Sequence, residues 1–441
     1  MGSSTLKLND GLSDIGSIIH YGISQIPVIG GVLSTIFGLL WPTDKEDIWS
    51  TIKQEVQSLI NEDIQEDDWN RLVAAVSELQ DKVSFINDQL INAQYDTAGP
   101  ELMTVVVDII GIEENFKIEG TNFKYAFAPL FVAAVNLKIA LYLEGIKYSN
   151  DLGLSQDQVN QLKSLLQKDV QSSKSYLSPI NSAIGNTYLN NIQTYFSVKL
   201  YYETSVSLFN ELWSGDYEDY NAPAPLENYY VPVMAAGSFY KLISLDGQNF
   251  SVPMAFAEVA DNSMMPSTNI LGSLYQEPTS YPDGYINFID VYTDLSVSHR
   301  TTGLMFTCSG SDEQYEMGMT PNNNDSFNVG QNTMSINVEG GEFINQVSVR
   351  ADSFVSQIEF TTNLNNTMVA GQHPDDDPIQ EVTLVSPFSI NSMYVVSDVA
   401  GYIQSSGHQM CGIAISAIYN NELAMQYVSS LYKNSHHHHH H

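Results

Sequence analysis

The feature that most constrains this chain is a long stretch that is apolar on every side. Residues 125–146 read YAFAPLFVAAVNLKIALYLEGI, and only Asn136, Lys138 and Glu144 are strongly polar. A helix that is apolar nearly all round has no face for water, so it must be enclosed by other helices or by lipid. At about 1.5 Å per residue it would be roughly 30 Å long, close to the thickness of bilayer hydrocarbon. The stretch predicts either a permanently buried central helix or a helix stored for membrane insertion.

Amphipathic helices flank this stretch between residues 10 and 214. Apolar residues recur at steps of three and four in the segments 48–60, 72–90, 102–110, 159–170 and 188–213. Capping boxes predict two of the helix starts, one at Thr43 with Glu46 and one at Ser155 with Gln158. Long helices with short connections favour a bundle. We therefore predict an α-helical domain over 10–214, with about seven helices and 125–146 at its centre.

The period of the sequence changes after residue 214. Residues 215–230 are polar, acidic and contain two prolines, which is typical of a linker. Beyond them, apolar and polar residues alternate in short runs such as 285–289 and 347–349, and turn-forming clusters separate these runs. The pattern predicts an all-β domain over 231–435, a sandwich or a prism. The six histidines at 436–441 are typical of an affinity tag and are left out of this reasoning.

The formal net charge of the chain is −34. Phosphate binding needs clustered Lys and Arg, so this charge argues against a nucleic-acid partner and against docking onto anionic lipid. A strongly negative surface also keeps a protein dispersed in water. Protonated carboxyl groups are easier to desolvate, so we expect any membrane insertion to be stronger at acidic pH.

No residue pattern in the chain predicts catalysis, a cofactor or a metal site. The acidic run 375–377 lacks the spacing and turn glycine of a calcium loop, and His373 and His408 have no metal-ligand spacing. Cys411 opens a run typical of a buried strand, so a core thiol is favoured over a nucleophile. Spacing leaves open whether Cys308 and Cys411 pair. These observations predict a protein that is not an enzyme.

Loops rich in tyrosine, Asp and Asn in the second half suit the recognition of sugars or proteins. Aromatic rings stack on a partner, and carboxylates accept hydrogen bonds from hydroxyl groups. Ordinary turn chemistry with partly buried tyrosine gives the same pattern. The candidate receptor-binding residues are Tyr281, Asp283, Tyr285, Asn322, Asn323, Asp375 and Asp376.

Several segments resemble a known family of toxins. SQIPVIGGVLSTIFGLLWP at 24–42 and DIWSTIKQEVQSLINEDI at 47–64 resemble the opening of domain I of the insecticidal δ-endotoxins, and more strongly the B subunit of the Pir binary toxins. IIGIEENFK at 109–117, the apolar stretch and GLSQDQVNQL at 153–162 follow in the matching order. The segments 343–363 and 392–415 resemble strand–turn–strand units of jacalin-like β-prisms. The sugar-binding signature of those lectins is not evident at 401–412, so no lectin site is carried over.

The resemblance implies a helical bundle followed by a β-prism, and a pore-forming mechanism. A bacterial protein released without a recognisable signal peptide would bind a receptor or glycan on gut epithelium through its β domain. It would then insert helices into the target membrane, with oligomerisation there. It would be the B component of a binary toxin whose smaller A-type subunit supplies a sugar-binding domain. The alternative is a carbohydrate- or protein-binding module whose helical domain is only structural.

The resemblance also implies roles for residues of the apolar stretch. The inserting residues would be Phe127, Leu130, Phe131, Val132, Val135, Leu137, Ile139 and Leu141. Asn136 and Lys138 would line the pore, because polar side chains in a span are costly toward lipid.

Overall fold

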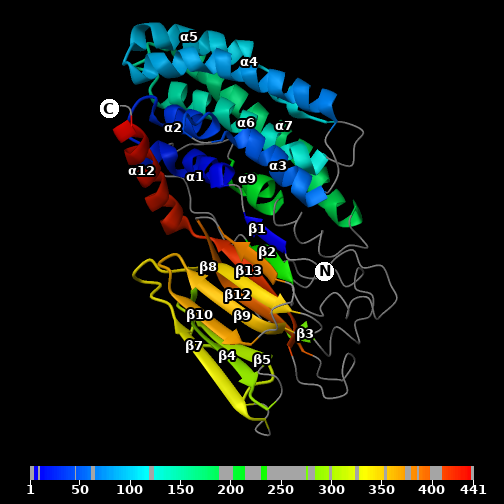
Figure 1. Cartoon of the computed structure of the whole chain (residues 1–441). Helices are drawn as coiled ribbons and strands as arrows, with labels where there is room; N and C mark the ends of the chain where they lie inside the picture. Colours follow the sequence, from blue (N-terminus) through cyan, green and yellow to red (C-terminus); the bar gives the residue numbers. More distant parts are fainter. Residues whose placement is uncertain are drawn as a thin grey trace. The chain divides into compact units, whose positions relative to one another are not determined.

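A computed structural model of the chain describes residues 4–7, 10–44, 46–60, 65–118, 124–187, 202–213, 230–235, 275–276, 284–296, 300–322, 327–351, 355–372, 379–384, 387–397 and 410–438. The described elements form two compact units, one helical and one made of strands (Figure 1). We call them the helical unit and the β unit. Each is described by itself below.

The helical unit contains all the described helices. They are α1 (Asp10–Gln25), α2 (Gly31–Leu40), α3 (Ile48–Ile60), α4 (Glu66–Ile91), α5 (Tyr95–Asp108), the 3-10 turn η1 (Ile112–Phe116), α6 (Lys124–Lys147), α7 (Gln156–Thr187), the π-helical turn η2 (Glu203–Ser207), α9 (Leu208–Leu212) and α12 (Asn421–His438). The apolar periodicity predicted the helices α3 to α7, and the structure has helices at these places. The apolar stretch is α6, packed among α1, α2, α3, α5 and η1.

The two predicted capping boxes have different outcomes. At α7, Ser155 and Gln158 form the predicted reciprocal pair: the Gln158 amide donates to Ser155 Oγ at 3.2 Å, and the Ser155 amide donates to Gln158 Oε1 at 2.9 Å. The box predicted at Thr43 and Glu46 is wrong. Helix α3 begins at Ile48, and Asp47 Oδ1 accepts from the Ser50 amide at 2.8 Å.

The C-terminal helix α12 belongs to the helical unit. Residues 421–435, which the sequence pattern placed in the β-rich domain, form most of this helix, and it packs on α1 and α2. Ala424 and Val428 are completely buried. The Tyr427 hydroxyl donates to Asp14 Oδ2 at 3.3 Å. The chain therefore returns to the helical unit after its last strand.

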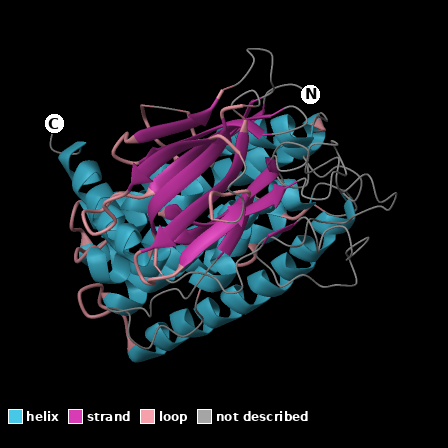
Figure 2. Ribbon diagram, turned by 90° about the horizontal axis from the view of Figure 1, so that it is seen from below, coloured by secondary structure: helices cyan, strands magenta, loops and turns pink. Residues whose placement is uncertain are grey.

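The β unit contains three sheets (Figure 2). The first has the order β1 (Ser4–Lys7), β11 (Ile379–Thr383), β8 (Ile344–Ala351), β9 (Val355–Thr362) and β10 (Thr367–Gly371). The second has β2 (Tyr230–Ala235), β13 (Met410–Tyr419), β12 (Phe388–Ser397) and β3 (Tyr275–Gln276). The third has β6 (Gln314–Gly318), β5 (Thr301–Cys308), β4 (Ile286–Asp294) and β7 (Val329–Ser335). Each described pair is antiparallel except β1 with β11.

The three sheets share one apolar core. Alternate residues point inward along β9: Ile358 and Phe360 are completely buried, whereas Gln357 and Glu359 are partly exposed. Side chains also link different sheets, for example Thr301 Oγ1, which donates to the Val355 carbonyl at 2.6 Å. A helical bundle followed by a β-prism is thus confirmed as the fold class. Cys308 is a free, buried thiol, and burial raises its pKa to about 12.

Candidate membrane-insertion site

Residues 127–146 of helix α6 are all buried. All eight residues predicted to insert are buried: Phe127 is 4% exposed, and Leu130, Phe131, Val132, Val135, Leu137, Ile139 and Leu141 are at most 1% exposed. Among the described helices, the segment Phe127–Lys147 is long and apolar enough to cross a membrane. The core helix of a soluble protein can have the same length and apolar composition.

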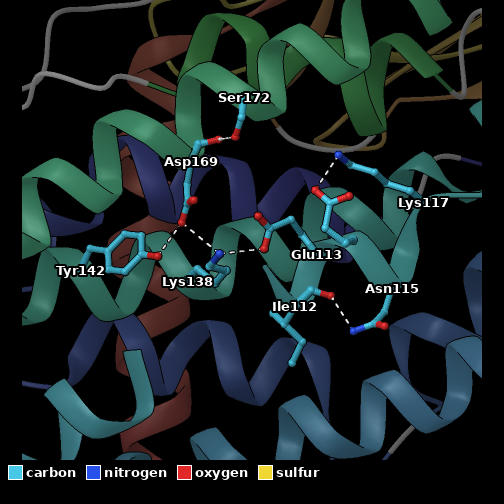
Figure 3. A network of polar contacts seen from close by, with 9 residues as sticks. Ile112, Glu113, Asn115, Lys117, Lys138, Tyr142, Asp169 and Ser172 are labelled. Carbon is cyan, nitrogen blue, oxygen red and sulfur yellow. Dashed lines mark hydrogen bonds and ion pairs between the residues drawn. The ribbon is translucent and has the colours of Figure 1, made fainter. Parts of the chain in front are cut away.

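Lys138 lies in the middle of α6 and is clamped between two carboxylates (Figure 3). Its Nζ is 2.7 Å from Glu113 Oε2 on η1 and 3.0 Å from Asp169 Oδ2 on α7. The side chains are at most 9% exposed. A buried charge is tolerated only when it is paired and hydrogen-bonded, so these three residues form one unit. The sequence pattern indicated Lys138 but neither Glu113 nor Asp169.

Tyr142 completes this cluster one turn further along α6. Its hydroxyl donates to Asp169 Oδ2 at 2.5 Å (Figure 3). Burial, followed by the nearby Asp169 charge, raises the pKa of Tyr142, so the hydroxyl keeps its proton and remains a donor. Asp169 therefore accepts from two α6 side chains, Lys138 and Tyr142, and ties α7 to α6.

Asn136 is held on another side of α6. Its Oδ1 accepts from Trp213 Nε1, which follows α9, at 2.6 Å. Residues two positions apart on an α-helix are rotated by about 200° about its axis, so Asn136 and Lys138 lie on nearly opposite faces of α6. The structure does not bring the two predicted lining residues together.

Glu144 fastens α6 to the start of α2. Its carboxylate accepts from the Gly30 amide at 2.8 Å and from the Leu33 amide at 3.2 Å. Unpaired amides at a helix N-terminus attract an anion, so this contact caps α2 from another helix. Gly30 has φ +80°, and a Cβ there would lie 2.7 Å from Leu90 Cβ, so the turn requires glycine. Burial raises the pKa of Glu144 to about 7, and the backbone amides oppose this rise.

Gly145 allows two other helices to approach α6. A Cβ at this position would lie 2.5 Å from Leu162 Cδ1 of α7 and 3.2 Å from Leu102 Cδ2 of α5. Both leucines are completely buried. The position marks a point where α5, α6 and α7 meet.

Only two of the predicted receptor-binding residues lie within the described residues. The Tyr285 ring packs edge-on against Phe343, with ring centroids 5.1 Å apart. Asn322 is exposed, and its Nδ2 donates to Glu316 Oε2 at 3.2 Å. Tyr285 comes just before β4, and the start of β4 pairs with the end of β5. Asn322 comes after β6, and the end of β6 pairs with the start of β5. The two residues therefore lie at opposite ends of one sheet. Tyr281, Asp283, Asn323, Asp375 and Asp376 lie outside the described residues.

Within the part of the chain that the structure describes, no cluster of three or more His, Cys, Asp or Glu side chains could hold a metal ion. His373 and His408 lie outside that part.

Most of the polar contacts of α6 lie within a segment that matches a known domain family. Residues 18–207 match the family described as the delta endotoxin N-terminal domain. This span contains α6 and every polar partner described above except Trp213. The match covers most of the helical unit.

Two solved structures are similar to this chain over most of its length. It is similar to the crystal structure of PirB, with a TM-score of 0.73, 19% identity, and coverage of 96% of this chain and 97% of that one. It is also similar to the insecticidal δ-endotoxin Cry8Ea1 of Bacillus thuringiensis, with a TM-score of 0.63, 15% identity, and coverage of 94% and 74%. The chain therefore has the fold seen in PirB and in Cry8Ea1.

The sequence relative is the pesticidal crystal protein Cry14Aa of Bacillus thuringiensis subsp. sotto. It is 23% identical over an alignment of 326 residues, with coverage of 65% of this chain and 26% of the relative. The chain thus spans about a quarter of the length of this curated relative.

Proposed function

We propose that this chain is a pesticidal pore-forming toxin that stores α6 in water and releases it into a target membrane. The observation that carries the proposal is the state of α6. It is long enough to span hydrocarbon, its residues 127–146 are all buried, and it lies in the segment that matches the delta endotoxin N-terminal domain. A purely structural core helix would explain the burial but not the match to a toxin domain.

The polar contacts of α6 support a two-state mechanism. In the closed state, Lys138 and Glu144 are both satisfied inside the unit. Opening breaks some of these contacts, and the membrane offers a new environment for the eight apolar residues. Two states of similar energy can be shifted by a ligand that binds one of them better. We propose that contact with the target cell supplies this bias.

Lys138 sets a condition on the inserted state. A lysine at the centre of a span costs about 3 kcal/mol toward lipid. Lys138 is 11 residues into the segment Phe127–Lys147, so it would lie near the bilayer centre. We propose that Lys138 faces the conducting path, and that Asn136, on the opposite side, meets a polar group of a neighbouring copy.

The β unit is the proposed receptor-binding part. Asn322 is exposed at one end of its third sheet, and Leu295, in the turn after β4 at that same end, is 42% exposed. Exposed loop residues on a rigid sheet are common recognition sites. A smaller partner subunit with a sugar-binding domain is the proposed companion, which makes this chain the B component of a binary toxin.

Asn322→Ala with Leu295→Ala should weaken binding to brush-border membrane without lowering leakage from pure lipid vesicles.

Dye release from brush-border membrane vesicles tests the pore. The wild-type chain should release dye, and Val135→Asp should not, because a carboxylate would enter the span. Val107→Asp is the matched control, because Val107 is 50% exposed on α5 whereas Val135 is completely buried. Circular dichroism before the assay shows which variants are folded. A wild-type chain that releases no dye, alone or with its partner subunit, contradicts the proposal.

A further inference from the structure

Helix α12 lies over two of the helices that cover α6. It packs on α1 and α2, and both of these helices pack on α6 (Figure 1). The segment that matches the toxin family, residues 18–207, ends long before α12 begins at Asn421. The helical unit therefore contains a helix from outside the matched segment, and that helix holds down part of the cover of α6.

Hydrogen bonds fix α12 to α1. The Tyr427 hydroxyl donates to Asp14 Oδ2 at 3.3 Å, and Ser429 Oγ donates to Gln25 Oε1 at 3.3 Å. Asp14 is 5% exposed, so its carboxylate depends on donors within the protein. The segment that follows it, residues 15–43, contains no Asp, Glu, Lys or Arg. Helix α12 thus shields an uncharged stretch of α1 and α2 and gives a buried carboxylate a donor.

Helix α12 is held less firmly than α6. Among residues 421–433, Ala424 and Val428 are buried, whereas the other residues are partly or fully exposed. In α6, by contrast, residues 127–146 are all buried. An element with few buried apolar contacts opens locally at a lower free energy than the core does. Helix α12 can therefore leave its seat on α1 and α2 before α6 moves.

A single residue connects α12 to the last strand of the β unit. Strand β13 ends at Tyr419 and α12 begins at Asn421, so Asn420 is the whole connection. The Asn420 amide donates to the Pro387 carbonyl at 2.9 Å, which ties it to the β unit. Asn421 Oδ1 accepts from the Tyr21 hydroxyl of α1. Because the connection is short and bonded on both sides, a displacement of β13 acts directly on α12.

We propose that α12 is an autoinhibitory clasp. In water it holds α1 and α2 over α6. When the β unit binds the target cell, β13 pulls α12 from its seat, and the helical unit can then open. Binding shifts this equilibrium because the bound β unit favours the state in which α12 is displaced. The proposal rests on the pore-forming function proposed above and adds the step that links binding to opening.

A reversible cross-link between α12 and α1 tests the clasp. Gln25→Cys with Ser429→Cys places two thiols where side chains now touch, and a short bis-methanethiosulfonate reagent joins them until a reductant is added. Dye release from brush-border membrane vesicles should fall at least about tenfold in the cross-linked chain and return with the reductant, because the closed state is locked. Each single cysteine variant and the wild type, with its own Cys308 and Cys411, receive the same reagent as controls. Release at the wild-type rate from the cross-linked chain overturns the proposal.

Weakening the seat should have the opposite effect. Tyr427→Phe with Ser429→Ala removes two hydrogen bonds to α1, so dye release from pure lipid vesicles, which offer no receptor, should rise about tenfold. Tyr202→Phe is the matched control, because it removes a tyrosine hydroxyl that donates to the Leu177 carbonyl at 3.0 Å in the same unit. An unchanged rate in the α12 variant, or an equal rise in the control, contradicts the clasp.

A longer connection tests the link to the β unit. A flexible Gly-Ser segment of about six residues, inserted between Asn420 and Asn421, gives the connection slack. Release from brush-border membrane vesicles should then slow about tenfold, toward the rate in pure lipid vesicles, where the insertion should have no effect. The same insertion after Gly310, in the exposed turn between β5 and β6, is the control. Equal rates in the two insertion variants would reject transmission through β13.

These failures differ from a failure of the pore itself. Each of the three experiments compares variants with a wild-type chain that releases dye. If the wild type releases none from either kind of vesicle, alone or with its partner subunit, the pore-forming function is wrong and the clasp falls with it. If the wild type releases dye and the cross-linked chain does so equally well, the clasp alone is wrong.

Discussion

At the scale of single residues, Glu144 has the most informative chemistry. Its carboxyl group is enclosed by protein and contacts the amides at the start of α2. Desolvation raises its pKa from an ordinary value near 4.5 to about 7. The folded helical unit thus holds a proton at Glu144 that an unfolded chain would release over this range of pH.

The sign of the resulting pH effect follows from linkage. Because the folded state binds more protons here, the contribution of Glu144 to stability is present below pH 4.5 and is lost as pH rises to about 7. The loss is on the order of 3 kcal/mol. Glu144→Gln should remove this dependence. Urea unfolding of both proteins at pH 5 and pH 8 measures it, and parallel pH dependences would contradict the prediction.

The sequence led us to expect stronger membrane insertion at acidic pH, because protonated carboxyl groups are easier to desolvate. That expectation stays a prediction, and Glu144 adds a second pH effect to it. Glu144 acts on the preceding step, because its deprotonation favours opening of the closed unit. Opening and insertion should therefore depend on pH in opposite directions.

Lys138 gives a second prediction at this scale. Lys138→Met leaves Glu113 and Asp169 buried without a cation, and losing one partner of a buried pair costs about 3–5 kcal/mol. Arg71→Met removes an exposed pair with Asp68 and should cost less than about 1 kcal/mol. Denaturant unfolding at pH 7 compares the two. Equal losses would mean that the buried cluster contributes no more than a surface ion pair.

At the scale of elements, local patterns predicted most helices and several strands. Helix α6 could be predicted because its residues are apolar on every side, and α7 because its cap and its periodicity agree. The predicted box at Thr43 failed because a short Ser/Thr–Glu spacing also occurs by chance. Asp47 lies next to the first helical residue, and its carboxylate reaches the Ser50 amide.

The contacts that define the site could not be predicted in this way. Glu113 and Asp169 lie 25 and 31 residues from Lys138, and no periodicity connects positions so far apart. The same holds for Glu144 with the start of α2 and for α12 with α1. The sequence shows which residues need a partner, but tertiary packing decides which partner they find.

The docking of α12 gives a prediction at this scale. Val428 is completely buried in the helical unit, whereas Met425 on the same helix is 38% exposed. Val428→Ala should destabilise the unit by about 2 kcal/mol, and Met425→Ala by less than about 0.5 kcal/mol. Thermal unfolding followed by circular dichroism compares them. Equal shifts would show that α12 does not contribute to the core.

At the scale of the whole molecule, the chain passes between its two units more than once. Strand β1 precedes α1, α9 is followed by β2, and β13 is followed by α12. The helical unit therefore opens, in our account, while both α1 and α12 stay covalently joined to the β unit. Helix α6 lies between these joints in the sequence.

The central claim is that α6 leaves the helical unit for the lipid. Photolabelling from within the bilayer tests it most directly. A lipid-soluble photoreactive reagent is activated in brush-border membrane vesicles while the wild-type chain releases dye, and labelled peptides are mapped by mass spectrometry. If α6 enters the lipid, adducts are expected on residues 127–146, and these adducts should be absent when the chain is labelled without membrane. Dye release with adducts confined to other helices, or with none on α6, would contradict it.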